Sequence, residues 1–332
     1  MNLQQRLVLL QELGDYILEN NEHWASVKER AQRENGWFIP EFTDLQSNHI
    51  ARHYLSSTGL ETFTQQYAIP SEAAASKNVG IVMAGNIPLV GFHDFMCAFL
   101  SGHRQTIKLS SRDAVLLKHL VERLVHWDPE VNDLVSFSDM LKGCDAYIAT
   151  GSNNTSRYFD YYFSKYPHII RKNRTSVSIL DGNETVSELQ SLADDVYQYF
   201  GLGCRNVTKI FVPKNYDFLP LLEAFKKYNY LFDHNKYRNN YDYQLALLML
   251  NRKYYMTNGS LILLENEPVF SPIGMLHYEY YDDVRKVEDS LENNESIQCV
   301  VGRNHVNFGK AQQPGILDYA DGVDTEKFLL SL

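Results

Sequence analysis

From residue 78 onward, short apolar runs alternate with amphipathic segments, and this alternation limits the fold more than any other feature of the sequence. The pattern predicts strands at residues 79–84, 105–109 and 146–150 and helices at residues 89–101 and 111–127, with Ser111 as the cap of the second helix. Strands that alternate with helices form parallel sheets, which bind ligands at the carboxyl ends of their strands. We therefore expect residues 76–172 to form a nucleotide-binding domain.

A second alternating block extends to about residue 305. Thr185 and Glu188 have the spacing of a capping box, which predicts a helix that starts at Val186. The block predicts strands at residues 176–180, 208–212, 261–265, 275–280 and 298–301, and helices at residues 186–200, 216–228 and 242–254. We expect residues 173–305 to form a second α/β domain and residues 306–332 to form a C-terminal tail, a candidate oligomerisation element.

The first 75 residues predict a helical lead-in that packs on the nucleotide-binding domain, with breaks near Pro40 and Ser57. His49 and His53 are one helical turn apart, but two histidines alone do not define a metal site, and no metal is expected. The first helix lacks the uninterrupted apolar core of a signal peptide, and the four cysteines are scattered without a CxxC pair. These features favour a cytoplasmic protein with reduced thiols.

The composition argues against two classes of partner. A net charge of -10 argues against nonspecific nucleic-acid binding, which depends on clustered basic residues. The longest apolar runs have the length of a strand, so no membrane span is expected. The tyrosine-rich stretch 228–255 fits a half-buried surface, and the alternatives are an apolar channel or a partner site.

One thiol stands out against this background. Cys204 follows Gly201 and Gly203 between a predicted helix and a predicted strand. Glycines allow a ligand to approach the backbone closely, and a cysteine on such a loop is a candidate nucleophile. The alternative is that Cys204 is a small buried hydrophobic residue, which is the more common role of a free cysteine.

Three loops at predicted strand ends carry a family resemblance: Gly85–Asn86–Ile87–Pro88, Thr150–Gly151–Ser152 and the loop of Cys204. Their order and flanks resemble the aldehyde dehydrogenase superfamily, and within it the LuxC-like acyl-CoA reductases. The resemblance covers about residues 78–215. It implies an aldehyde dehydrogenase-like α/β fold, in which a parallel-sheet nucleotide-binding domain precedes an α/β catalytic domain.

The resemblance assigns roles to two residues of the reaction centre. Cys204 matches the nucleophile that carries the acyl group as a thioester. Asn86 matches the residue whose amide donates a hydrogen bond to the substrate oxygen, where negative charge develops. The alternative for Asn86 is that it makes the turn before Pro88.

The resemblance also implies a nicotinamide cofactor site. Lys108 matches the lysine that contacts the adenosine ribose, and Ser111 stands where many NAD-using relatives have a carboxylate. With Arg112 beside it, this position suits a 2′-phosphate, so NADPH is expected and NADH is the alternative. Gly151 and Ser152 match the turn that faces the pyrophosphate. The same residues also fit ordinary surface charge and an ordinary strand–turn–helix junction.

Two departures from the family pattern bear on the reaction. Glu267 only partly matches the glutamate that holds the nicotinamide ribose, and it also fits a solvated loop carboxylate. Ile170 occupies the position of the glutamate that hydrolytic aldehyde dehydrogenases use to activate water. Without that base, an acyl-enzyme resists hydrolysis, as a thioester reductase requires.

The resemblance therefore implies NADPH-dependent reduction of a fatty acyl thioester, either acyl-CoA or an acyl-protein, to an aldehyde. It also implies an acyl-activating or acyl-transfer enzyme as a partner, and a homodimer. Two other functions fit the same residues. A cysteine acyltransferase or thioesterase would use Cys204 without redox chemistry, and a noncatalytic nucleotide-binding protein would bind the cofactor without becoming acylated.

Overall fold

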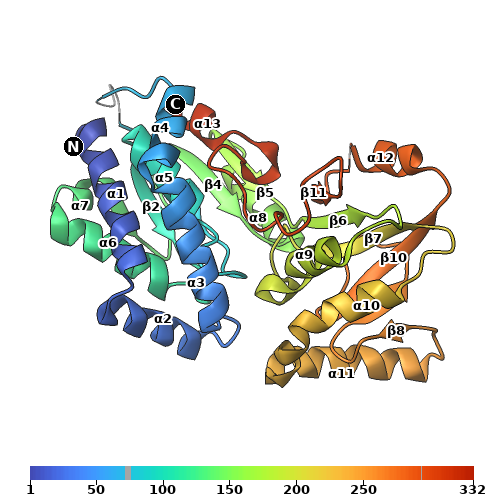
Figure 1. The fold of residues 1–332 in the computed structure, drawn as a ribbon. Helices are drawn as coiled ribbons and strands as arrows, with labels where there is room; N and C mark the ends of the chain where they lie inside the picture. Colours follow the sequence, from blue (N-terminus) through green and yellow to red (C-terminus); the bar gives the residue numbers. More distant parts are fainter. Residues whose placement is uncertain (72–75, 293) are drawn as a thin grey trace. The chain divides into compact units, whose positions relative to one another are not determined.

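The computed structural model describes residues 1–71, 76–292 and 294–332. The chain forms two compact units, which are coloured along the sequence in Figure 1. Unit 1 comprises Met1–Asn173 together with Gly315–Leu332, and unit 2 comprises Arg174–Pro314.

A parallel sheet of five strands forms the centre of unit 1. Its strands follow the order β3-β2-β1-β4-β5, and every pair is parallel, as the alternating pattern predicts. The strands are β1 (Asn78–Val82), β2 (Arg104–Lys108), β3 (Val135–Phe137), β4 (Ala146–Thr150) and β5 (His168–Arg171). The direction in which successive strands are added reverses between β1 and β4, and open α/β sheets bind ligands beside such a switch point.

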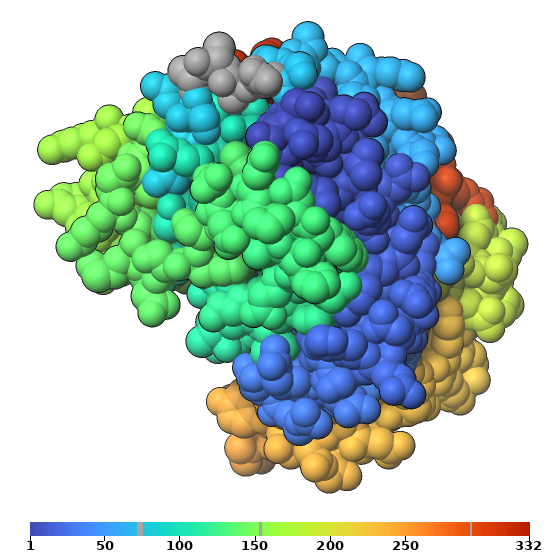
Figure 2. Space-filling view, turned by 90° about the vertical axis from the view of Figure 1, so that its left-hand side faces the viewer, coloured from blue at the N-terminus to red at the C-terminus, as the bar shows by residue number. Residues whose placement is uncertain are grey.

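Helices cover this sheet and bury its apolar faces. They are α1 (Leu3–Glu19), α2 (Glu22–Glu34), α3 (Pro40–His49), α4 (Ser57–Gln66), α5 (Phe92–Ser101), α6 (Val115–Trp127), α7 (Val131–Leu134) and α8 (Asn153–Phe163), with a π-helical turn at Ile50–Tyr54. Helix starts at Pro40 and Ser57 confirm the predicted breaks. Figure 2 shows α1 and α2 beside α6 and α7 on one face of the unit.

Two predicted helix starts in unit 1 are wrong. Ser111 does not cap α6, which begins at Val115 after Ala114, because residues 110–113 form a turn closed by a hydrogen bond from the Asp113 N–H to the Ser110 carbonyl. Helix α5 begins at Phe92 and not at Leu89, since Leu89 has a left-handed φ of 53°. The predicted end of α5 at Gly102 is confirmed by a left-handed C-cap.

The C-terminal segment belongs to unit 1. It contains a 3-10 turn at Ala320–Gly322 and the helix α13 (Thr325–Leu330). Buried Arg171 forms an ion pair with Asp94 of α5 and donates to the Thr325 hydroxyl at 2.7 Å. Leu329 is fully buried in the core of the unit. Arg171 is therefore a buried residue that ties α5 and α13 together in the interior of unit 1.

Unit 2 is built on a six-stranded sheet with the order β11-β6-β7-β10-β9-β8. Its strands are β6 (Thr175–Ile179), β7 (Val207–Pro213), β8 (Met256–Thr257), β9 (Ile262–Glu265), β10 (Met275–Tyr281) and β11 (Ile297–Val301), and β8 alone among them is antiparallel to its neighbour. The helices are α9 (Val186–Tyr197), α10 (Leu219–Phe225), α11 (Asn235–Leu250) and α12 (Val284–Glu292), with 3-10 turns at Gln198–Gly201 and Lys226–Asp233.

The start of α9 matches its prediction and its end does not. The capping box of Thr185 and Glu188 is present. The helix ends at Tyr197, before the predicted end at Phe200, since Tyr199 and Phe200 adopt left-handed φ values of 54° and 57°.

The predicted helix at residues 242–254 lies earlier in the chain, as α11. In the tyrosine-rich stretch, Tyr237 and Tyr241 are buried whereas others are exposed, which fits a half-buried surface.

Among the residues that the structure describes, no helix combines the length and the apolar character needed to cross a membrane.

Candidate active site

All the candidate cofactor residues except Glu267 lie at one edge of the unit 1 sheet. Val82 of β1 is in register with Lys108 of β2 on one side and with Ala149 of β4 on the other. All three strands are parallel, so the loops that follow them emerge at the same edge. Local sequence patterns predicted each loop, and the register brings the loops together at the switch point.

The loop that carries Asn86 packs closely against the loop after β2. The Met83 N–H donates to the Lys108 carbonyl at 3.0 Å. A Cβ on Gly85 would lie 2.6 Å from the Ser110 hydroxyl oxygen and 2.7 Å from the Ser110 Cβ. Only glycine fits at this position without a shift of the neighbouring loop. Asn86 itself is half-buried.

A buried carboxylate supports the same loop and was not identified from the sequence. Asp113 Oδ2 accepts a hydrogen bond from the Leu89 N–H at 2.7 Å. Burial raises the pKa of Asp113 to about 7, while the bond from Leu89 partly opposes this shift. In the sequence, Asp113 looks like an ordinary acidic residue near a helix start. Its role depends on a contact 24 residues away along the chain.

The remaining cofactor candidates of unit 1 are accessible to an anionic ligand. Lys108 is exposed at the end of β2, and Ser111 and Arg112 are exposed in the loop that follows. Ser152 is the N-cap of α8, where it accepts a hydrogen bond from the Thr155 N–H at 3.3 Å. A Cβ on Gly151 would lie 2.9 Å from the Phe159 ring, so glycine lets the first turns of α8 pack against the strand end. Exposed cations and a helix N-terminus are groups that can hold the phosphates of a dinucleotide.

Cys204 lies in unit 2, on the turn between the 3-10 segment after α9 and strand β7. It is half-buried and therefore differs from fully buried Cys97. The turn is closed by a hydrogen bond from the Asn206 N–H to the Gly203 carbonyl at 3.1 Å. The left-handed residues after α9 include Gly201, with a φ of 73°, and they turn the chain off the helix before it reaches Cys204.

A second cysteine belongs to the surroundings of this turn. The Ser176 hydroxyl lies 3.1 Å from Cys299 Sγ and donates to the Cys204 carbonyl at 3.2 Å. The pKa of the Cys299 thiol is raised by burial, and the hydrogen bonds with Ser176 and Arg205 oppose this shift. Arg205, the residue after Cys204, thus contacts the Cys299 thiol. The sequence did not identify Cys299 or Ser176, because they lie far from residue 204 in the chain.

Glu267 lies on the exposed loop after β9 in unit 2. Its backbone carbonyl accepts a hydrogen bond from Lys209 Nζ at 2.6 Å, and Lys209 also forms an ion pair with Glu279. The backbone of Glu267 is therefore held by a buried lysine while its side chain is exposed. Glu267 and Cys204 belong to unit 2, whereas Asn86 and the other cofactor candidates belong to unit 1. Ile170, which the resemblance aligns with the hydrolytic glutamate, is a residue of strand β5.

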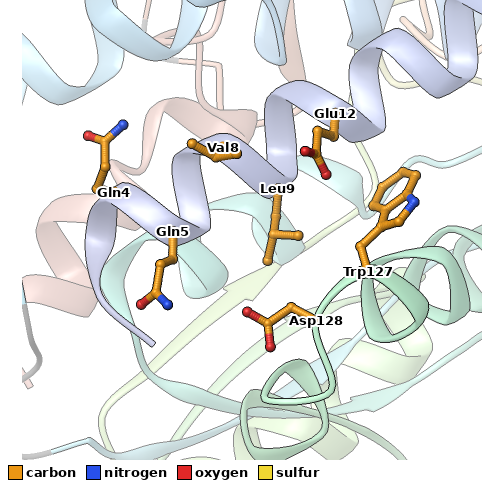
Figure 3. Close-up of a pocket in the computed structure, with 7 residues that line it drawn as sticks. All are labelled: Gln4, Gln5, Val8, Leu9, Glu12, Trp127 and Asp128. Carbon is orange, nitrogen blue, oxygen red and sulfur yellow. The ribbon is translucent and has the colours of Figure 1, made fainter.

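Among the described residues, the site includes neither a metal-binding cluster nor the hollow beside α1. Within the described ranges, no three His, Cys, Asp or Glu side chains are grouped so that they could hold a metal. Figure 3 shows a shallow hollow of about 280 Å³ on unit 1, between α1 and the end of α6. None of the candidate residues lines this hollow. The residues that line it are Gln4, Gln5, Val8, Leu9, Glu12, Trp127 and Asp128.

Comparisons with known proteins agree with this architecture. The family model described as acyl-CoA reductase (LuxC) matches residues 56–220, which include both Asn86 and Cys204. Among curated proteins, none matches the chain. AldA indole-3-acetaldehyde dehydrogenase from P. syringae, solved with NAD+ and IAA, is similar in structure, with a TM-score of 0.66 and 13% identity over 91% of this chain and 72% of that chain.

Two further solved structures have the same fold. Aldehyde dehydrogenase KauB from Pseudomonas aeruginosa has a TM-score of 0.66 at 13% identity, over 90% of this chain and 71% of its own. Aldehyde dehydrogenase 21 from Physcomitrella patens, solved with succinate, has a TM-score of 0.64 at 14% identity. The match covers 91% of this chain and 73% of that chain. The predicted aldehyde dehydrogenase-like α/β fold is confirmed. The chain thus has the fold of the aldehyde dehydrogenases, and its residues 56–220 are similar to the LuxC acyl-CoA reductase family.

Proposed function

We propose that this protein reduces a fatty acyl thioester, acyl-CoA or acyl-protein, to an aldehyde with NADPH, through an acyl group carried on Cys204. The observation that supports this most is the setting of Cys204: a half-buried thiol on a hydrogen-bonded turn, within the segment matched by the acyl-CoA reductase family. A structural cysteine is usually inside the core, as Cys97 and Cys144 are.

In this mechanism, the Cys204 thiolate attacks the thioester carbonyl of the substrate and displaces the thiol of the donor, which leaves with the proton. The Asn86 amide donates a hydrogen bond to the substrate oxygen as negative charge develops on it. A bound nicotinamide supplies a hydride. With that hydride and one proton from water, the acyl-cysteine becomes a thiohemiacetal, which collapses to the aldehyde and restores the Cys204 thiol. Ile170 stands in place of the hydrolytic glutamate and has no group that could activate water, so the proposed acyl-cysteine persists until it is reduced.

The cofactor proposal rests on the loops around the switch point of the unit 1 sheet. Similar structures, such as AldA, are described in complex with NAD+. In this chain, Ser111 stands in place of a carboxylate, and exposed Lys108 and Arg112 flank it. The positive charge of these two side chains favours a 2′-phosphate, which supports NADPH over NADH. Gly151 and Ser152 are proposed to face the pyrophosphate, and Glu267 the nicotinamide ribose.

One experiment distinguishes this function from its two alternatives. The protein is incubated with acyl-CoA of several chain lengths, and the peptide that contains Cys204 is examined by mass spectrometry for the acyl group. NADPH is then added and aldehyde is measured. A Cys204→Ala variant should lose both the adduct and the aldehyde, whereas Cys144→Ala, which changes a buried cysteine of unit 1, should keep them.

Each outcome selects one function. An adduct followed by NADPH-dependent aldehyde supports the reductase. An adduct that transfers to another thiol or to water, with no oxidation of NADPH, supports an acyltransferase or thioesterase. Cofactor binding without any adduct supports a noncatalytic nucleotide-binding protein and rejects Cys204 as the nucleophile.

We also propose that the enzyme is cytoplasmic, that it forms a homodimer and that it receives its substrate from an acyl-activating or acyl-transfer enzyme. A thioester is an activated acyl group, so a reaction that consumes it requires a preceding step that forms it. The mass of the protein in solution tests the dimer, and faster aldehyde formation when such an enzyme is added tests the partner.

A further inference from the structure

We propose that Ser176 and Asn206 are positioning residues that clamp the backbone on both sides of the Cys204 Cα and thereby orient its thiol. The inference rests on the proposed role of Cys204 as the nucleophile. It adds two residues that the family resemblance did not assign, and both are completely buried in unit 2.

Asn206 holds the turn from the side of α9. Its Oδ1 accepts a hydrogen bond from the Gly203 N–H at 2.8 Å, and its Nδ2 donates to the carbonyls of Asp195 at 3.0 Å and Gln198 at 2.8 Å. The side chain therefore satisfies backbone groups on both sides of the left-handed segment after α9. The last carbonyls of a helix carry partial negative charge, which would oppose a thiolate nearby. The Asn206 amide donors offset that charge close to the turn of Cys204.

Ser176 holds the turn from the side of the sheet. Its hydroxyl donates to the Cys204 carbonyl at 3.2 Å. A serine hydroxyl carries one proton, so the Cys299 S–H, whose sulfur lies 3.1 Å away, is the donor in the contact between these two side chains. The Cys299 N–H also donates to the Ser176 oxygen, at 3.3 Å. Strand β11 is thus connected through Ser176 to the peptide group that directly follows the Cys204 Cα.

The two residues act on both sides of the Cys204 Cα. The Asn206 side chain fixes the N–H of Gly203, and the Asn206 backbone N–H donates at 3.1 Å to the Gly203 carbonyl, in the peptide group directly before that Cα. Ser176 fixes the C=O of Cys204, in the peptide group directly after it. With the peptide groups on both sides held, rotation at the Cα of Cys204 is restricted, and so is the direction of its Cα–Cβ bond. A nucleophile held in one orientation reacts faster than one that samples several, and a misplacement of about 1 Å can cost about 100-fold.

Strand β6 provides a matched control for Ser176. Ser178 lies two residues further along β6, so its side chain is on the same face, and it is equally buried. Within the described part of the chain, the Ser178 hydroxyl has no hydrogen-bond partner. Ser176→Ala and Ser178→Ala therefore remove the same atom from the same strand, and only the first removes a bond to the Cys204 turn.

The first test measures acyl transfer from acyl-CoA to Cys204 in single turnovers, together with kcat and KM. We expect acylation and kcat to fall about tenfold in Ser176→Ala with KM unchanged, because orientation of the nucleophile affects the reaction and not substrate binding. The acylation rate and kcat of Ser178→Ala should remain close to those of the unaltered chain. Equal effects in the two variants, or no effect in Ser176→Ala, would overturn the proposal.

The second test does not need the proposed reaction. Alkylation of Cys204 by iodoacetamide is followed across pH in the full chain. Asn206→Asp keeps the oxygen that accepts from Gly203 but replaces the donor with a carboxylate, so the midpoint of the alkylation profile should move to higher pH. Ser176→Ala should alkylate about threefold more slowly, the effect of one weak hydrogen bond, and Ser178→Ala at the unaltered rate.

The two tests separate the possible failures. If the unaltered chain forms no acyl adduct, the proposed function fails, and alkylation still tests the clamp. If Asn206→Asp does not fold, as measured by its circular dichroism, the comparison of Ser176→Ala with Ser178→Ala decides. Alkylation rates that are identical in those two variants would reject the clamp even if acylation occurs.

Discussion

Asp113 accepts a hydrogen bond from the backbone N–H of Leu89, at 2.7 Å, and so joins the segment before α6 to the loop that carries Asn86. Its other carboxyl oxygen is buried without a hydrogen-bond partner among the described residues. Burial raises the pKa of Asp113 to about 7 from an ordinary value of 3.8. The loop proposed to bind the substrate oxygen therefore rests on a group that titrates near neutral pH.

Replacement of Asp113 by Asn should change how stability depends on pH. Because the pKa of Asp113 is raised in the folded state, its protonated carboxyl stabilises the fold. This contribution is complete below pH 3.8, the pKa of the unfolded state, and it is lost as the pH rises through about 7. Each unit of the shift corresponds to about 1.4 kcal/mol. We expect Asp113→Asn to unfold at a higher temperature than the unaltered chain at pH 8. The two should converge at pH 4, and parallel curves at all pH values would contradict this role.

Loss of the Asn86 amide should slow the reaction. One oxyanion donor contributes about 100-fold to 1,000-fold in kcat, so Asn86→Ala should lose activity by about this factor with a smaller change in KM. Steady-state kinetics of aldehyde formation measure the effect. Asn132→Ala, in an exposed helix of the same unit, is the control and should leave kcat unchanged. A kcat within twofold of the unaltered value in Asn86→Ala would favour a role for this residue in the turn alone.

Cofactor preference should depend on the residues after β2. Arg112→Ala removes a positive charge from the proposed 2′-phosphate site and should reduce kcat/KM for NADPH more than for NADH, by about tenfold. Ser111→Asp should reduce kcat/KM for NADPH further, because the new carboxylate repels the 2′-phosphate. The ratio of kcat/KM for the two cofactors is the measurement, with exposed Lys118→Ala as the control. A ratio that is insensitive to both variants would place the 2′-phosphate elsewhere.

Gly85 and Ser110 should show compensating effects. A Cβ on Gly85 would meet both the Cβ and the hydroxyl of Ser110 at less than 3 Å, so Gly85→Ala should displace the loop of Asn86 and lower both kcat and the unfolding temperature. Ser110→Gly removes both contacting atoms. The double variant should therefore recover most of the loss. If it is as impaired as Gly85→Ala alone, the steric explanation is wrong.

Local signals in the sequence predicted the elements well. The capping box at Thr185 and Glu188 and the left-handed end at Gly102 involve hydrogen bonds between residues at most four apart, so the order of residues suffices to identify them. The short strands β3 and β5 were not predicted. Three or four residues carry too little periodicity, and these strands exist because they extend the edges of a sheet that is already formed.

Some residues of the candidate site could likewise be found from the sequence, and others only from the structure. Asn86, Ser152 and Cys204 could be selected from the sequence because each lies in a loop after a recognisable strand or helix, and Lys108 because it matches a lysine of the resembled family. Asp113 and Ser176 could not, because each acts through a bond to a backbone group 24 or 28 residues away. No pattern in the sequence distinguishes Ser176, which holds the Cys204 turn, from Ser178, which has no partner in the described ranges.

The sequence by itself determined the alternation of strands and helices, the parallel sheets and the glycine-bounded loop of Cys204, since these follow from periodicity and from the backbone preferences of single residues. Only the tertiary structure decided which strands are neighbours, that residues 315–332 return to unit 1, and which buried side chains support the loops. Those contacts join segments far apart in the chain. Their stability comes from burial and hydrogen bonds that exist only after the units have folded.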